Sequence, residues 1–407
     1  MSQVRECETP EDRMVEILSR LPPKSLMRFK CIRKSWCTLI NSPCFVAKHL
    51  SDSVDNKLSS STCILLNCSQ AHVCSEESWK QGVLWSVINL SIDGDELHYD
   101  IEDLTNAPFL KDDHHEVEIH GYCDGIVCVT VDENFFLCNP ATGEFRQLPD
   151  SCLLLPLPGV KEKFGLETTL KGLGFGYDCK AKEYKVVRII ENYDCEYSDG
   201  EETYIEHTAL PHTAEVYTTT ANSWKEIKIN ISSKILSLYS YPYSCSVYLK
   251  GFCYWLSSDD EEYICSFNLG DEIFDRIELP SRRESGFKLD GIFLYNESIT
   301  YYCTSYEERS RLFEIWVMDN YDGVKSSWTK HLTAGPFKGI EFPLTLRKHD
   351  ELLMIASDGR ATSYNSSTRN LKYLHIPVII YRNRVIDYAK SIVPVKRVEG
   401  KAPFSPI

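Results

Sequence analysis

The feature that most constrains this chain is a hairpin-like unit that recurs along residues 63–395. In each unit a residue before a polar turn is followed, seven positions later, by a bulky apolar residue that opens the next strand-like run. The four clearest pairs are Cys138 with Phe145, Tyr217 with Trp224, Phe267 with Phe274, and Tyr364 with Leu371. A longer turn before Trp328 fits the same scheme, and residues 88–104 form a weaker version. Short apolar runs separated by turn signals predict β-strands, and their repetition predicts a repeat architecture.

The spacing of the units favours a propeller. Unit starts near residues 63, 119, 172, 245, 290 and 342 give a period close to the ~50 residues of kelch-type blades. Radial packing of four-stranded blades leaves few free strand edges. We therefore expect a kelch-like propeller of about six blades, with residues 390–395 pairing with the first blade to close the ring. A pair of β-sandwiches is the alternative.

The first 50 residues have helical rather than strand periodicity. Pro10 suits the first helical position, Pro22-Pro23 ends one helix and begins the next, and Ser42-Pro43 resembles a further helix start. Apolar residues recur at helical spacing: Met14, Ile17, Leu18, Leu21, Leu26, Phe29, Ile32, Trp36, Leu39 and Ile40. Three short helices bury a poor core. The module is therefore expected to need another surface, either a partner or the body of its own chain.

These patterns predict an α+β multidomain fold: a small three-helix module followed by a mostly-β, kelch-like propeller. The expected boundaries are a module at 1–50, a serine-rich linker at 51–62, the propeller at 63–395 and a C-terminal tail at 396–407.

Charge and composition narrow the classes of partner. The net charge of the chain is −15, although residues 1–50 hold nine Lys or Arg against five Asp or Glu. An acidic body disfavours nucleic acid and anionic membranes and favours basic partners, unless it serves only solubility. The 17 cysteines lack C-x-x-C spacing, and no apolar run approaches the ~20 residues that span a bilayer. We expect a cytoplasmic protein, with the nucleus as a second compartment.

No catalytic constellation is recognisable. The glycines of Gly172–Gly176 lack the spacing of a dinucleotide loop and are interpreted as an inner strand where space is short. His114 and His115 would point to opposite faces of a strand and so chelate poorly. We expect neither a catalytic residue, nor a metal site, nor a cofactor.

Acidic segments between strand-like runs are the candidate binding sites. Such segments are where β scaffolds place binding loops, although plain solvated loops are an equal alternative. The candidate residues are Asp93, Asp95, Glu96, Asp112, Asp113, Glu191, Asp194, Glu196, Asp199, Glu201, Glu202, Asp259, Asp260, Glu261 and Glu262.

The segment LSRLPPKSLMRFKCIRKSWCTLI at 18–40 resembles the F-box. The resemblance implies a helical module that docks on a Skp-type adaptor and, through it, on the cullin and RING subunits of a ubiquitin ligase. The motif positions it carries over are Pro10, Ile17, Leu18, Leu21, Pro22, Leu26, Phe29, Ile32, Trp36, Leu39 and Ile40. The sequence does not sort those that build the module from those that touch the adaptor.

The remainder resembles the F-box-associated domain of plant F-box proteins. GYCDGIVCV at 121–129, LCNPATGEFRQLP at 137–149 and GLGFGYDCKAKEYKVVRI at 172–189 carry that resemblance. TAEVYTTTANSWKEIKI at 213–229 and EIWVMDNYDGVKSSWTK at 314–330 are most similar to the pollen S-locus F-box proteins of pome-fruit trees. That family implies a non-catalytic subunit, in the pollen-tube cytosol, that recognises basic non-self S-ribonucleases and directs their ubiquitination in self-incompatibility.

Two other hypotheses remain. The chain could be an F-box adaptor for an unrelated plant client, or a propeller lectin or binding protein whose helices serve only packing.

Overall fold

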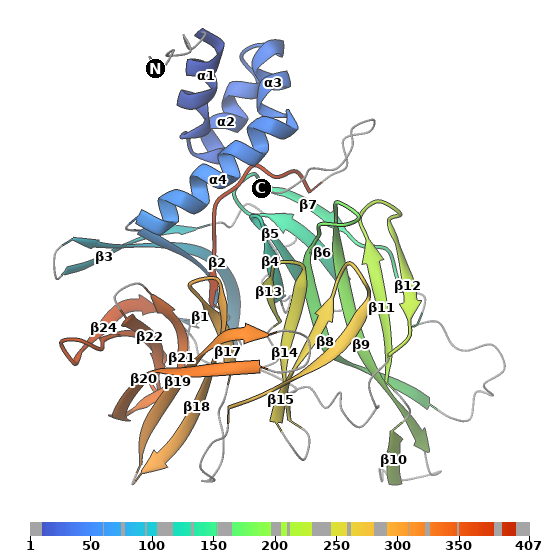
Figure 1. Ribbon diagram of the computed structural model, residues 1–407, viewed down its shortest axis with the longest axis vertical. Helices are drawn as coiled ribbons and strands as arrows, with labels where there is room; N and C mark the ends of the chain where they lie inside the picture. Colours follow the sequence, from blue (N-terminus) through green and yellow to red (C-terminus); the bar gives the residue numbers. More distant parts are fainter. Residues whose placement is uncertain are drawn as a thin grey trace, which may run out of the picture.

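The computed structural model describes most of the chain from residue 10 to residue 395. The described residues are 10–59, 61–74, 78–93, 96–103, 117–131, 134–151, 153, 165–196, 205–209, 212–229, 246–258, 262–280, 291–307, 309–321, 326–347, 350–377 and 385–395. Four helices come first and strands follow, and Figure 1 shows the helices gathered at one end of a body of twisted sheets.

The helical module consists of α1 (Pro10–Ser19), α2 (Pro23–Lys30), α3 (Lys34–Ile40) and α4 (Pro43–Ser59). The predicted helix starts at Pro23 and Pro43 are confirmed. At the second of these, the Ser42 hydroxyl accepts a hydrogen bond from the Phe45 amide at 3.3 Å, which is the contact of an N-cap. Short helices of this kind depend on packing against one another.

Five blades are built from strands that are consecutive in the chain. Their strands are β4 (Val117–Cys123), β5 (Ile126–Val131), β6 (Asn134–Asn139) and β7 (Glu144–Gln147); β8 (Gly165–Asp178), β9 (Glu183–Glu196), β10 (Ile205–Ala209), β11 (Thr213–Thr218) and β12 (Ser223–Ile227); β13 (Val247–Leu249), β14 (Phe252–Ser258), β15 (Glu262–Asn268) and β16 (Ile273–Glu278); β17 (Gly291–Tyr295), β18 (Ser298–Glu307), β19 (Ser310–Tyr321) and β20 (Ser326–Lys338); β21 (Ile340–Arg347), β22 (Glu351–Ala356), β23 (Arg360–Asn365) and β24 (Asn370–Pro377).

A further sheet joins the two ends of the body. Its strand order is β25-β1-β2-β3, where β1 is Ser61–Cys74, β2 is Ser78–Asp93, β3 is Glu96–Asp103 and β25 is Val385–Asp387. The pairing of β25 with β1 brings Ile386 opposite Leu65. The ends of the strand region therefore meet in one sheet.

The predicted fold class is wrong on two counts. The module has four helices rather than three, and five blades rather than six are made of consecutive strands, because β1–β3 draw their fourth strand from the other end of the body. Most of the expected linker at 51–62 is helical, because α4 extends to Ser59. No proline or glycine follows Pro43 within this helix to end it earlier. The segment that pairs with β1 is 385–387 and not 390–395.

The seven-residue spacing in the sequence is confirmed as a hairpin register. Its four pairs, Cys138↔Phe145, Tyr217↔Trp224, Phe267↔Phe274 and Tyr364↔Leu371, are all directly opposed across strands. Met318 opposes Trp328 in the longer version. The last turn residue has a positive φ in all four regular hairpins, at Gly143, Asn222, Glu272 and Arg369. The left-handed residue completes a four-residue turn, and this is why the period in the sequence is so regular.

The inner strand β8 is packed tightly against its neighbour. A Cβ atom on Gly174 would lie 2.6 Å from Cζ2 of Trp255 and 2.9 Å from Sγ of Cys253, both on β14. The interpretation of the glycines as residues of a crowded inner strand is therefore confirmed. The two blades that contain β8 and β14 share a core of fully buried residues that includes Val187, Trp255, Tyr263, Cys265 and Phe267.

Candidate interaction surfaces

The structure sorts the F-box-like positions of the module by burial. Leu18, Leu26 and Ile40 are at most 2% exposed and form the module core together with Phe45 and Val46. Leu21, Phe29, Trp36 and Leu39 are half-buried against this core, and Pro22 is exposed. The position of the Pro10 side chain lies outside the described residues.

Three large apolar side chains of the module remain open to solvent, and two isoleucines are the most exposed of them. Ile17 on α1 is 63% exposed and Ile32, between α2 and α3, is 59% exposed. Met14 is 37% exposed on the same helix as Ile17. The exposed residues Lys24, Arg28, Arg33 and Lys34 lie on the neighbouring segments. Apolar side chains with a basic rim are typical of a surface that a partner covers.

Polar contacts hold α4 against α1. Lys48 Nζ lies 2.9 Å from a carboxylate oxygen of Glu16, and Nε2 of His49 lies 3.1 Å from the Leu21 carbonyl oxygen. Burial lowers the pKa of His49, which is only 2% exposed, although the Leu21 carbonyl opposes this shift. The module therefore retains its shape without using Ile17 or Ile32.

The antiparallel blades divide the body into two faces. The turns β4–β5, β6–β7, β8–β9, β11–β12 and β15–β16 lie on the side of the helices, which we call the module face. Contacts between turns support this grouping, for example the Thr220 amide donating to Glu183 Oε2 at 2.8 Å. The ends of β9, β14 and β15 away from these turns define the opposite, distal face (Figure 1). A partner of the helices would leave the distal face open.

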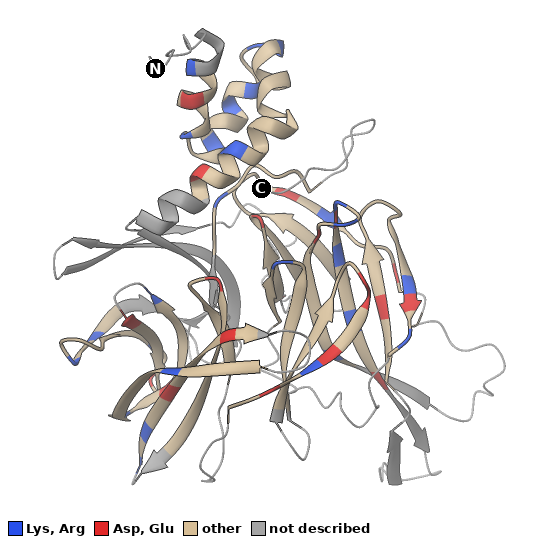
Figure 2. Ribbon diagram, in the orientation of Figure 1, with Lys and Arg blue, Asp and Glu red and all other residues tan. Residues whose placement is uncertain are grey.

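The acidic candidate residues do not form one site. Asp93 and Glu96 oppose each other where β2 ends and β3 begins. Asp194 and Glu196 belong to β9 and Glu262 begins β15, so these residues continue strands toward the distal face instead of lying in loops as predicted. Asp95, Asp112, Asp113, Asp199, Glu201, Glu202, Asp259, Asp260 and Glu261 lie outside the described residues. In Figure 2 acidic and basic residues are intermixed over the described strands.

Glu191 already has partners within its own blade. Its side chain is 12% exposed, with Lys171 Nζ at 2.5 Å and His212 Nε2 at 3.6 Å. The Lys171 ammonium and the His212 imidazole both lie beside this carboxylate, so the structure favours a role for Glu191 in blade packing.

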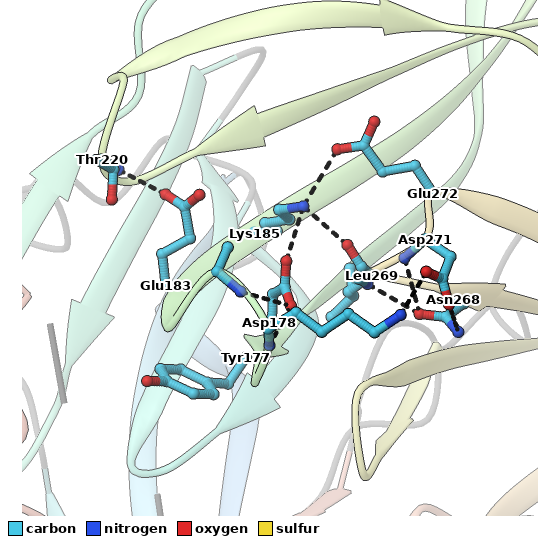
Figure 3. A network of polar contacts seen from close by, with 12 residues as sticks. Tyr177, Asp178, Glu183, Lys185, Thr220, Asn268, Leu269, Asp271 and Glu272 are labelled. Atoms are coloured by element: carbon cyan, nitrogen blue, oxygen red, sulfur yellow. Dashed lines mark hydrogen bonds and ion pairs between the residues drawn. The ribbon is translucent and has the colours of Figure 1, made fainter. Parts of the chain in front are cut away.

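A polar network on the module face joins two blades (Figure 3). Lys185 on β9 is 5% exposed, and its Nζ lies 2.9 Å from Asp178, 3.1 Å from Glu272 and 2.8 Å from the Leu269 carbonyl oxygen. Lys180 pairs with Asp271 at the exposed edge of the network.

The charges of this network stabilise one another. Burial alone would lower the pKa of Lys185, but Asp178 and Glu272 outweigh it and raise that pKa. Burial would raise the pKa of Asp178, but Lys185 and the amides of Ala181 and Lys180 bring it below its usual value. The network is a clamp between blades whose charges are already matched, which argues against a ligand site.

Tryptophans of the repeat join other blades. Trp224 Nε1 donates to the Pro149 carbonyl at 2.7 Å, and Trp328 Nε1 donates to the Glu278 carbonyl at 2.9 Å. In each case the acceptor follows or ends the last strand of the preceding blade. The Arg188 guanidinium, paired with Glu215, also lies 5.1 Å from the Trp224 ring centroid. The aromatic residue of the period therefore has a structural role.

No group of three or more His, Cys, Asp or Glu side chains that could hold a metal occurs among the described residues. His114 and His115 lie outside them. Within the same described part, no helix is long and apolar enough to cross a membrane.

Fold and surfaces together define a β-propeller protein with a helical module on one face. The chain belongs to the F-box associated beta propeller domain family, whose model matches residues 83–390. It is similar to F-box/kelch-repeat protein At3g17530 of Arabidopsis thaliana, with 25% identity over 83% of this chain and 78% of that protein. It is also similar to F-box/kelch-repeat protein At3g23880 of Arabidopsis thaliana, with 26% identity over 89% of each chain. Among solved structures, the Dos1 propeller aligns with a TM-score of 0.33 and 12% identity over 78% of this chain and 74% of its own. The family and these relatives support a plant F-box protein with the role of a substrate adaptor.

Proposed function

We propose that this protein is the substrate-recognition subunit of a Skp–cullin–F-box ubiquitin ligase. The observation that carries the proposal is the exposure of Ile17 and Ile32 on a module whose core is complete without them. A Skp-type adaptor with an apolar, acid-rimmed surface would cover both side chains, and the cullin and RING subunits would join through that adaptor. In this role the chain holds the client near the active centre of its partner enzymes. Such positioning accelerates the transfer of ubiquitin without a catalytic residue in the chain itself.

Binding of the full chain to a Skp-type adaptor tests this part of the proposal. Burying the exposed part of one isoleucine contributes roughly 1–2 kcal/mol, so Ile17→Asp and Ile32→Asp should each weaken adaptor binding about tenfold or more. Ile273→Asp is the matched control, because Ile273 is 51% exposed on β16 of the propeller. Equal affinities for all three variants would exclude Ile17 and Ile32 from the adaptor contact, whereas no adaptor binding by the native chain would favour a propeller binding protein or lectin.

We further propose that the client is a basic, non-self S-ribonuclease in the pollen-tube cytosol, with the nucleus as a second compartment. Support comes from the net charge of −15, from the sequence resemblance to pollen S-locus proteins, and from a distal face that the adaptor would leave open. Complementary charge would speed encounter and make binding sensitive to salt.

A panel of purified S-ribonucleases, assayed with the adaptor-bound chain at low and moderate salt, tests the client. We expect binding to some members, weakened by salt and by neutralising Glu196, Asp199, Glu201 and Glu202 together. Adaptor binding without binding to any ribonuclease would leave an F-box adaptor for a different client.

A further inference from the structure

Residues 388–395 cross the module face in an extended form that belongs to no sheet. They follow β25 directly, and Figure 1 shows this segment running between α4 and the ends of β5 and β7. Tyr388 and Ser391 are fully buried, and Ile392 and Val393 are at most 4% exposed. Buried backbone outside a sheet needs hydrogen-bond partners from elsewhere.

The blade β4–β7 supplies those partners. Asn139 Nδ2 donates to the carbonyl oxygens of Ser391 at 3.1 Å and Val393 at 2.9 Å. The Ala389 amide donates to the Tyr122 hydroxyl at 2.7 Å. These contacts bind main-chain atoms of a segment about 250 residues away in sequence, and Asn139 itself is fully buried.

Glu144 and Asp124 continue the attachment at the turns of the same blade. The Val395 amide donates to Glu144 Oε2 at 3.0 Å, and the Ser391 hydroxyl donates to the Asp124 carbonyl at 2.5 Å. The segment is therefore held along its length by one blade.

Its apolar side chains share a buried cluster with the helical module. Ile392, Val393 and Val395 belong to one buried cluster with Leu18, Leu26, Ile40 and Phe45 of the helices and with Leu137 and Leu148 of the blade. Lys30 on α2 is close enough to Glu144 for the carboxylate to raise its pKa, although burial lowers that pKa overall. One short segment therefore contributes to both packing units.

We infer that residues 388–395 are a strap that fixes the helical module to the propeller, and that Asn139 is the positioning residue that holds the strap. The orientation of the helices relative to the distal face then depends on the C-terminal segment as well as on α4. If the proposed function holds, the strap also fixes the distance between a bound client and the ligase partners.

The chain offers a matched pair of variants. Oδ1 of Asn139 accepts the Ala141 amide, two residues on, at 3.0 Å, and Oδ1 of Asn365 accepts the Thr368 amide, three residues on, at 2.9 Å, so each asparagine accepts an amide of its own turn. Aspartate keeps that acceptor. Asn139→Asp additionally removes the two donated bonds and places a carboxylate against two carbonyl oxygens, whereas Asn365→Asp leaves the strap unchanged.

Hydrogen–deuterium exchange and small-angle X-ray scattering of the full chain test the strap. In Asn139→Asp we expect exchange of residues 388–395 to accelerate about tenfold or more and the maximum dimension to increase. Exchange of β14 and β15 should stay at the native rate, which shows that the propeller is folded. Asn365→Asp should match the native chain in both measurements.

Three results would overturn the inference: native exchange of 388–395 in Asn139→Asp, equal effects in both variants, or faster exchange with unchanged scattering. If Asn139→Asp does not fold, Glu144→Ala removes the acceptor of the Val395 amide, together with the carboxylate near Lys30, and should raise exchange at that end of the strap. Unchanged exchange there would likewise refute it. None of these measurements needs the adaptor, so they stand apart from a failure of the proposed function.

Discussion

The clamp around Lys185 leads to a quantitative prediction, since two lysines of one network differ in burial. Replacing Lys185 by methionine keeps most of the volume of the side chain and removes its charge. Asp178, whose side chain is 2% exposed, then loses its cation, and the Leu269 carbonyl loses its donor. Lys180→Met is the control, because Lys180 and Asp271 have side chains that are 66% and 45% exposed.

The expected loss follows from these contacts. Breaking a buried ion pair from one side costs about 3–5 kcal/mol. Asp178 retains the amides of Lys180 at 2.8 Å and Ala181 at 3.2 Å, and Glu272 retains Lys225 at 3.2 Å. We therefore expect the lower end, about 3 kcal/mol, for Lys185→Met. An exposed pair contributes ~0–1 kcal/mol, so Lys180→Met should change stability by less than about 1 kcal/mol.

Urea unfolding of the native chain and both variants, repeated between pH 7 and pH 4, is the assay. The pKa values of Asp178 and Glu272 are lowered in the folded state. Their contribution is therefore present above their ordinary values of 3.8 and 4.5, and is lost as pH falls through the folded-state pKa values. Without Lys185, burial raises the pKa of Asp178, so the difference between native and Lys185→Met should narrow toward pH 4. Equal losses in the two variants at pH 7, or a difference that grows on acidification, would refute the reasoning.

Three further predictions concern packing and pH. Gly174→Ala should lower the free energy of unfolding by about 1–3 kcal/mol, because its Cβ would lie 2.6 Å from Trp255. A free energy of unfolding in urea equal to that of the native chain would contradict the close approach. Trp224→Phe should lower the free energy of unfolding by about 0.5–1.5 kcal/mol, because it removes the hydrogen bond to the Pro149 carbonyl. An unchanged free energy in the same assay would contradict a role for this bond. The lowered pKa of His49 means that its neutral form stabilises the module above the ordinary value of 6.5, and that this contribution is lost as pH falls through the folded-state pKa. The melting temperature should therefore decline between pH 7.5 and pH 5.5, with a weaker decline in His49→Gln; identical profiles would exclude His49 as the cause.

The sequence by itself determined the local features. A hairpin places residues seven positions apart opposite each other, so Cys138↔Phe145 and Tyr217↔Trp224 could be predicted from spacing alone. The helix starts at Pro23 and Pro43 were likewise visible, because proline at the first turn acts through its own backbone. A family resemblance to F-box proteins was also readable from short motifs, and the family model agrees with it.

Only the tertiary structure distinguished buried from exposed residues in the module, and paired from unassigned acidic residues in the propeller. Helical spacing treats Ile17 and Leu18 alike, yet one is 63% exposed and the other 2%. Glu191 was grouped with acidic loops, although its carboxylate pairs with Lys171 and lies beside His212 within its blade. The number of blades was also mistaken, because it depends on which distant segment packs beside β1.

The contacts that connect one blade or the helical module to another part of the chain could not be predicted from local sequence patterns. Asn139 and Asn365 occupy the same place in the same kind of turn, and only the fold brings Ser391 and Val393 to one of them. Lys185 meets Glu272 across 87 residues in the same way. Spacing in the chain determines contacts within a turn, but a contact across such separations exists only once the intervening chain has folded.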